Sequence, residues 1–200
     1  MKMKLLVVAA ATTIASSAMA QSAFQGAYGQ IGIGYQSSKG KTDVPITFDS
    51  TNGFASTVAA GYNFSVSKEF LLGIGAEYSF VPTSNANLSY TDSDTGLPGK
   101  EQYKNQNTYN IFLSPGYVLS KDSLAYAKVG YTGTTYKFSS GGSDNLSGYS
   151  LGLGYKQIIN GGLYGFAEGN YLSYGNKTTD SGIKLSGNSM NLLVGLGYKF

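Results

Sequence analysis

The segment Met190-Asn191-Leu192-Leu193-Val194-Gly195-Leu196-Gly197-Tyr198-Lys199-Phe200 carries the pattern that decides the fold. Every second residue, from Met190 to Phe200, is apolar, and most of the residues between them are small or polar. Alternate side chains of a β-strand point to opposite faces of the sheet. The segment therefore predicts a strand with one wholly apolar face.

The same alternation recurs along the chain, and the resulting strands are expected at 27–36, 54–64, 70–80, 109–117, 125–131, 149–155, 165–171 and 190–200. On the apolar face of these segments there is no Asp, Glu or Lys. A slip of one residue would move Glu77, Lys128, Lys156, Glu168 and Lys199 onto that face. The charges therefore define the register of the strands.

The connections between the strands alternate in length. Short connections are expected near 65–69, 120–123 and 159–162, and long ones near 37–52, 81–107, 137–148 and 175–187. Outward aromatic residues also gather near both ends of the strands, where the interfaces of a bilayer would lie. This layout predicts an all-β fold, an eight-stranded antiparallel up-and-down transmembrane β-barrel with four extracellular loops.

A soluble, lipocalin-like barrel is the alternative fold, because parity alone does not say which face is inside. That fold would place the apolar residues inside and the charges outside. The two aromatic belts, the glycines on the charged face and the terminal Phe200 favour the membrane barrel.

The N-terminal residues have the features of an export signal. Lys2 and Lys4 precede an apolar stretch over 5–15, and Ala18-Met19-Ala20 forms a small-x-small cleavage site. We expect residues 1–20 to be a cleaved secretory signal peptide, with cleavage between Ala20 and Gln21, and residues 21–200 to form one outer-membrane β-barrel domain. An uncleaved anchor is the alternative, but the stretch is too short to span a bilayer as a helix.

Composition argues against several functions. Loss of Lys2 and Lys4 lowers the formal net charge from +3 to +1, and the chain has no Arg, so a nucleic-acid partner is not expected. It also has no His and no Cys, which removes the commonest general base and the usual metal ligands. A Ser-Lys or carboxylate site is compatible with the composition, but no spacing points to one. We therefore expect no enzyme activity, no cofactor and no metal.

The terminus Leu193-x-Gly195-x-x-Tyr198-x-Phe200 resembles the C-terminal signal by which bacterial outer-membrane barrels are recognised for assembly. With Gly26 to Tyr35, Tyr126 to Tyr131 and Phe166-Ala167-Glu168, the chain resembles the small eight-stranded family that includes the OmpA transmembrane domain, OmpX and the opacity-type proteins. The resemblance implies a bacterial outer-membrane location and contact with the barrel-assembly machinery and periplasmic chaperones. The interior charges differ from the OmpA arrangement, so its ion-pair gate is not transferred.

The inward face places Glu77, Lys128, Glu168 and Asn110 near mid-barrel, with Lys156 lower. Two carboxylates in one compartment could serve acid–base chemistry. However, an eight-stranded barrel is only wide enough for its own side chains, so charges inside it must pair. We therefore interpret these five residues as an interior polar network that fills the lumen.

The expected role is that of a small, monomeric barrel serving envelope integrity and surface interaction through its loops. Its expected partners are outer-membrane lipids, lipopolysaccharide and a surface ligand held by the loops. The alternative function is a narrow, porin-like channel for ions or small solutes, which requires that the inward side chains leave the lumen open.

Overall fold

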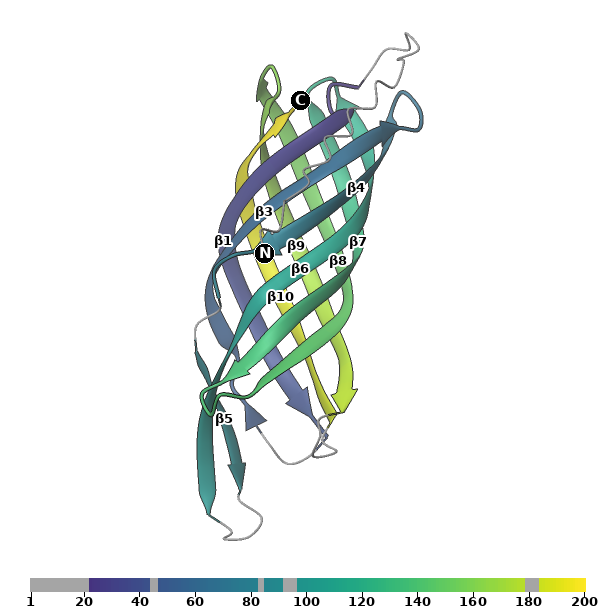
Figure 1. Cartoon of the computed structure of the whole chain (residues 1–200). Helices are drawn as coiled ribbons and strands as arrows, with labels where there is room; N and C mark the ends of the chain where they lie inside the picture. Colours follow the sequence, from purple (N-terminus) through teal and green to yellow (C-terminus); the bar gives the residue numbers. More distant parts are fainter. Residues whose placement is uncertain (1–21, 44–46, 83–84, 92–96, 179–183) are drawn as a thin grey trace, which may run out of the picture.

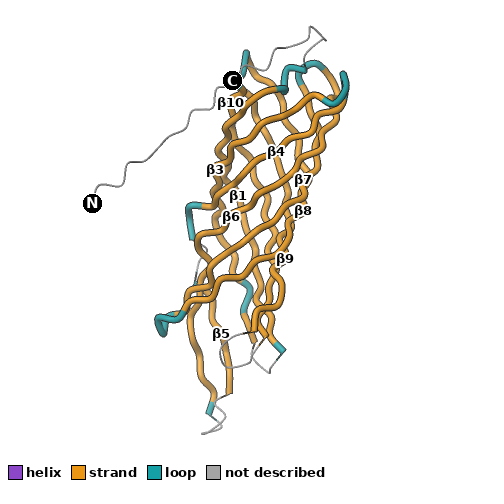
Figure 2. Tube along the Cα trace, turned by 45° about the vertical axis from the view of Figure 1, so that its right-hand side comes forward, coloured by secondary structure: helices purple, strands orange, loops and turns teal. Residues whose placement is uncertain are grey.

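The computed structural model describes residues 22–43, 47–82, 85–91, 97–178 and 184–200. The expected signal peptide and its cleavage site after Ala20 lie outside these residues. Within the described ranges, no helix is long and apolar enough to cross a membrane. The backbone there consists of strands joined by turns and loops (Figure 2).

Eight long antiparallel strands form a closed ring (Figure 1). They are β1 (Gly26–Thr42), β3 (Thr51–Ser65), β4 (Phe70–Ser79), β6 (Pro98–Ser120), β7 (Ser123–Phe138), β8 (Ser143–Asn160), β9 (Leu163–Thr178) and β10 (Lys184–Lys199). Each strand pairs with the next long strand along the chain, and β10 pairs with β1 to close the ring. The predicted eight-stranded up-and-down barrel is confirmed.

Two short strands extend the sheet beyond this ring. The strand β5 (Ala86–Thr91) pairs with the start of β6, and β2 (Thr47–Phe48) pairs with β5. They project from the end of the barrel opposite the C-terminus (Figure 1). That end is the extracellular one, because the chain terminus and the short turns lie at the periplasmic end of such barrels.

The outward face is apolar along the whole ring. Leu153 and Leu192 are 72% and 70% exposed, whereas Lys128 is only 3% exposed. A soluble barrel would reverse this arrangement, so the lipocalin-like alternative is wrong. Among the residues expected to face outward, Ser56 is buried.

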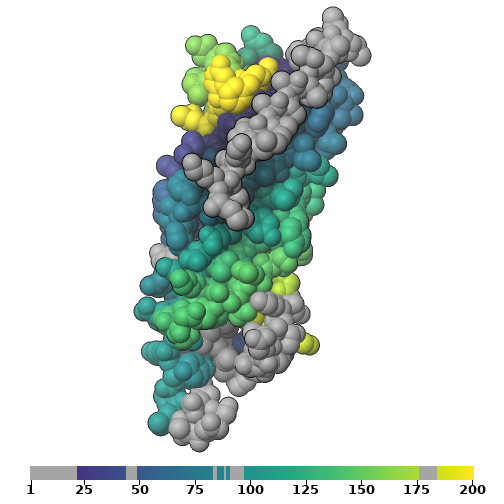
Figure 3. Space-filling view, in the orientation of Figure 1, coloured from purple at the N-terminus to yellow at the C-terminus, as the bar shows by residue number. Residues whose placement is uncertain are grey.

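The three short turns lie where they were predicted, between β3 and β4, β6 and β7, and β8 and β9. In the third turn, Gly161 has a φ of 55°, a left-handed conformation that suits glycine in a tight hairpin. In the space-filling view, β6, β7 and β8 lie side by side and run obliquely across the face of the barrel that is turned to the viewer (Figure 3).

The prediction of four long loops is wrong over much of their length, because the strands continue into them. Residues 98–107 belong to β6, and Tyr103 is 2% exposed, so this segment is not a freely solvated loop. The strands were expected to end where outward residues stop being apolar. Beyond the bilayer the outward face contacts water, so polar residues there are compatible with a continuing strand.

Candidate functional site: the barrel interior

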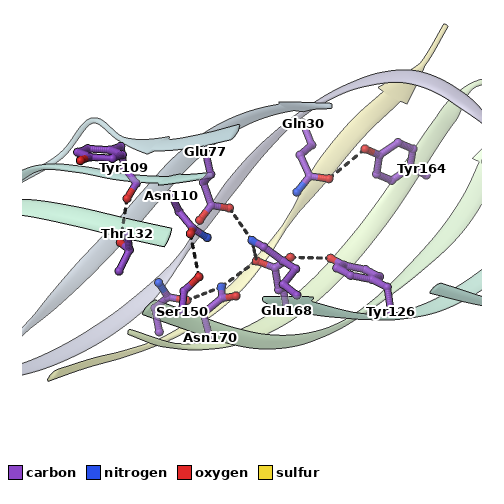
Figure 4. A network of polar contacts seen from close by, with 12 residues as sticks. Gln30, Glu77, Tyr109, Asn110, Tyr126, Thr132, Ser150, Tyr164, Glu168 and Asn170 are labelled. Atoms are coloured by element: carbon purple, nitrogen blue, oxygen red, sulfur yellow. Dashed lines mark hydrogen bonds and ion pairs between the residues drawn. The ribbon is translucent and has the colours of Figure 1, made fainter. Parts of the chain in front are cut away.

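An ion-pair group crosses the middle of the barrel. The Lys128 Nζ of β7 donates to Glu77 Oε2 of β4 at 3.1 Å and to Glu168 Oε1 of β9 at 2.8 Å (Figure 4). The side chains of Lys128 and Glu168 are each 1% exposed, and that of Glu77 is 9% exposed. Burial of such charges is tolerated because each contacts an opposite charge.

Two neutral side chains also donate hydrogen bonds to the Glu168 carboxylate. The Tyr126 hydroxyl donates to Glu168 Oε2 at 2.7 Å, and the Asn170 amide donates to Glu168 Oε1 at 2.7 Å. The contact between Tyr126 and Glu168 was not among the sequence predictions. The inward parity of Tyr126 was the available signal, but its contact with Glu168 depends on the positions of β7 and β9.

Asn110 lies beside the ion-pair group and contacts a different partner. It is the cross-strand neighbour of Glu77, and its Oδ1 accepts a hydrogen bond from the Ser150 hydroxyl at 2.8 Å. The structure therefore places Asn110 at the depth that the sequence indicated. Its hydrogen bond links β6 to β8 over Gly130 of β7, the strand between them.

Lys156 lies among aromatic rings instead of carboxylates. Its Nζ is 4.0 Å from the ring centroid of Tyr28, 4.9 Å from that of Tyr164 and 5.1 Å from that of Tyr126. Within the described ranges, no carboxylate lies within ion-pair distance of Lys156. Ring faces attract a cation that has been desolvated. The structure thus sets Lys156 apart from the ion-pair group with which the sequence analysis had placed it.

The rest of the membrane-spanning interior is filled by aromatic side chains packed on glycines. A Cβ built on Gly154 would meet the ring of Tyr126, and one built on Gly197 would meet the ring of Tyr164. A cavity of about 10 Å³ next to Lys128 and Lys156 has room for about one water molecule. The interior is therefore packed like a protein core.

Above the membrane, the lumen contains an apolar cluster of Ala86, Tyr103, Tyr136, Leu146, Leu172, Tyr174 and Leu185. The rings of Tyr103 and Tyr136 stack at a centroid distance of 5.8 Å. The Tyr103 hydroxyl donates to the Asp49 carbonyl oxygen at 2.8 Å, and burial raises the pKa of Tyr103 to about 12. This hydroxyl therefore stays protonated at neutral pH.

The residues of the expected assembly signal lie on both faces of β10. Tyr198 and Phe200 are exposed on the outside, with ring centroids 5.4 Å apart. Gly195 lies on the inside against the Ile31 carbonyl group and the Phe166 ring. The two aromatic residues are thus accessible to other molecules, whereas Gly195 is a packing position.

The buried acidic side chains of the ion-pair group already have hydrogen-bond partners. The described residues include no group of three or more acidic side chains placed to hold a metal ion. Both buried carboxylates already accept hydrogen bonds from Lys128. The arrangement joins strands and fills space.

The chain is similar to solved small barrels. OprG from Pseudomonas aeruginosa is 16% identical with a TM-score of 0.54, over 88% of this chain and 96% of that one. Neisserial surface protein A is 17% identical with a TM-score of 0.52, over 88% and 98%. Ail of Yersinia pestis, in complex with the heparin analogue sucrose octasulfate, is 18% identical with a TM-score of 0.48, over 88% and 100%. At these identities the likeness concerns the fold.

No curated protein matches the chain. The family model described as outer membrane protein beta-barrel domain matches residues 6–200, which is nearly the whole chain. This match agrees with the closed ring, the apolar outer face and the buried charges, and it places the protein in the outer membrane. The chain belongs to the outer membrane protein beta-barrel domain family.

Proposed function

We propose that this protein is a non-enzymatic, non-conducting barrel that serves envelope integrity and presents its extracellular end for surface interactions. The single observation that carries this proposal is the bridge of Lys128 between Glu77 and Glu168 across the lumen. A hydrated ion on this path would have to displace two buried ion pairs. Breaking such pairs leaves uncompensated charge in a medium of low polarity, which is costly.

Packing on both sides of the ion pairs supports the same function. Toward the periplasm, Phe24, Leu71 and Leu124 form one apolar cluster. Toward the cell exterior, the cluster around Tyr103 and Tyr136 forms another. Water and ions would have to cross all three layers, and the cavity beside Lys128 holds about one water molecule.

The extracellular end supports the second part of the proposal. There β5 and the start of β6 extend past the ring, with β2 paired to β5. Binding surfaces are commonly carried by such projections on a rigid scaffold. Tyr103 and Ala86 pack in the apolar cluster, so β5 and the start of β6 are fixed to the barrel.

Conductance in a planar lipid bilayer tests the closed lumen. We expect the refolded protein to give no current steps above those of a protein-free bilayer, with folding verified by a heat-dependent gel shift. The triple variant Glu77→Ala, Lys128→Ala and Glu168→Ala removes the bridge but keeps both apolar layers, so current steps from this variant alone would show that the bridge is the layer that closes the lumen. Stable current steps from the unmodified protein would refute the proposal and favour the narrow, porin-like channel.

We further propose that the mature protein starts at Gln21. The basic start, the short apolar stretch and the small-x-small site support cleavage after Ala20. Intact-mass measurement of protein isolated from outer membranes should give the mass of residues 21–200. A mass that includes residues 1–20 would favour the uncleaved anchor instead.

A further inference from the structure

A pair of lysines lies on the outer face of the barrel, above its extracellular aromatic belt. Lys104 of β6 and Lys137 of β7 are direct partners in the antiparallel ladder. Lys137 is exposed and Lys104 is partly exposed. The Cβ atoms of such cross-strand partners are about 5 Å apart, and like charges in this arrangement destabilise the sheet.

A β-bulge brings Lys104 to this face. The register of β6 against β7 shifts between Gln106 and Tyr109, and Asn107 between them has a φ of 53°. The Tyr78 hydroxyl donates to Asn107 Oδ1 at 3.0 Å and holds the bulge. The extra residue reverses the parity of β6 above it, so Tyr103 and Asn105 turn inward and Lys104 turns outward.

The described part of the chain provides no acidic partner for the lysine pair. Within the described residues, no carboxylate lies within 4.0 Å of either ammonium group. The neighbouring acids have the opposite parity. Glu101 is two residues from the buried Tyr103 and accepts a hydrogen bond from the Ser140 amide at 3.0 Å, and Asp144 is the ladder partner of the buried Tyr136.

The depth of the pair fits a lipid headgroup. Tyr109 and Tyr131, with ring centroids 6.5 Å apart, belong to the extracellular aromatic belt on the same two strands. Lys104 is five residues beyond Tyr109, which is roughly 12 Å along the membrane normal for a tilted strand. Flexible lysine side chains at this height reach the region just outside the hydrocarbon, where headgroup phosphates lie.

Polar, uncharged side chains lie beside the pair. The Thr135 hydroxyl donates to Asn145 Oδ1 at 2.8 Å on the same face, and Ser143 is the ladder partner of Lys137 on β8. These hydroxyl and amide side chains can donate hydrogen bonds to sugar hydroxyls and can also accept hydrogen bonds from them. The face thus combines two cations with a polar rim.

We propose that Lys104 and Lys137 form a binding site for a phosphate group of lipopolysaccharide in the outer leaflet. The phosphate would lie between the two ammonium groups and cancel their repulsion, with sugars on the polar rim. Charge complementarity, the absence of an acidic partner among the described residues and the height above the aromatic belt together favour this occupant. The site lies on the outer wall, so it does not depend on a closed lumen.

The test compares the binding of purified lipopolysaccharide by protein variants refolded in detergent. Lys104→Gln combined with Lys137→Gln should weaken binding about 30-fold, because each lysine near an anionic surface contributes a factor of about five and the two factors multiply. Lys68→Gln combined with Lys121→Gln removes the same charge in the periplasmic turns and should change binding less than about twofold. Chemically dephosphorylated lipopolysaccharide should bind the unmodified protein as weakly as phosphorylated lipopolysaccharide binds the Lys104 and Lys137 double variant.

Lys137→Glu gives an independent readout. It replaces the repulsive pair by an ion pair with Lys104, so the lipid-free protein should melt at the same or a higher temperature while lipopolysaccharide binding falls. Unchanged binding in the Gln double variant, or equal binding of the dephosphorylated lipid, would overturn the proposal. Inorganic phosphate binding as tightly as lipopolysaccharide would also overturn it, since the site would then recognise the free ion.

Discussion

Replacement of Lys128 by Met will lower the free energy of unfolding by about 3 to 5 kcal/mol, the usual cost of breaking a buried ion pair by removal of one partner. The methionine side chain fills a similar volume but leaves Glu77 and Glu168 buried side by side without a cation. Urea titration of the protein in lipid vesicles, followed by the heat-dependent gel shift, measures the change.

A matched control comes from the second interior lysine. Lys156→Met makes the same chemical change at a site that is equally buried, but the contacts of this ammonium group within the described residues are with tyrosine rings. It should cost less than about 2 kcal/mol, the upper range of a desolvated cation–π contact. Combining Lys128→Met with Glu77→Gln and Glu168→Gln should recover much of the lost stability. Equal losses at Lys128 and Lys156 would show that the carboxylate contacts do not set the stability.

Replacement of Gly195 by Ala should strongly reduce the fraction of protein that folds. A Cβ at this position would meet the Ile31 carbonyl oxygen, would lie 2.8 Å from Gly32 Cα and would lie 2.6 Å from an edge carbon of the Phe166 ring. Ile31 and Gly32 belong to β1, which pairs with β10 to close the barrel. The backbone there cannot move away without opening that seam, and overpacking of this kind costs about 1 to 3 kcal/mol or more.

Gly29→Ala is the control for this variant, since it introduces the same methyl group on β1. The nearest atom to a Cβ at Gly29 is a Phe200 ring carbon at 4.0 Å, so stability should change little. Refolding into vesicles without assembly machinery separates two roles of Gly195. A clash predicts failure in vesicles as well as in cells. Normal refolding of the Gly195→Ala variant in vesicles would mean that Gly195 is needed only for recognition by the barrel-assembly machinery.

The sequence alone was sufficient to predict the ring of eight strands and its three short turns. Lipid imposes an apolar outer face wherever a strand crosses the hydrocarbon, so the alternation is visible residue by residue. The same constraint placed Glu77, Lys128 and Glu168 on the inner face, because each of them would be costly in lipid. The constraint ends at the membrane surface, which is why the extracellular parts of β6 and β7 were mistaken for loops.

Only the tertiary structure decided which side chains meet. Parity gives a face but no partner, because the contacts across a closed barrel depend on the tilt and relative shift of its strands. That is why Lys128 contacts two acids, whereas Lys156, on the same inner face, contacts three tyrosines. The bulge at Asn107 likewise reverses the parity of Lys104. The alternation of apolar and polar residues in the sequence does not show where such an extra residue is inserted. Alternation is imposed locally by the solvent on each side of a strand, whereas partners and bulges are set by how all eight strands close together.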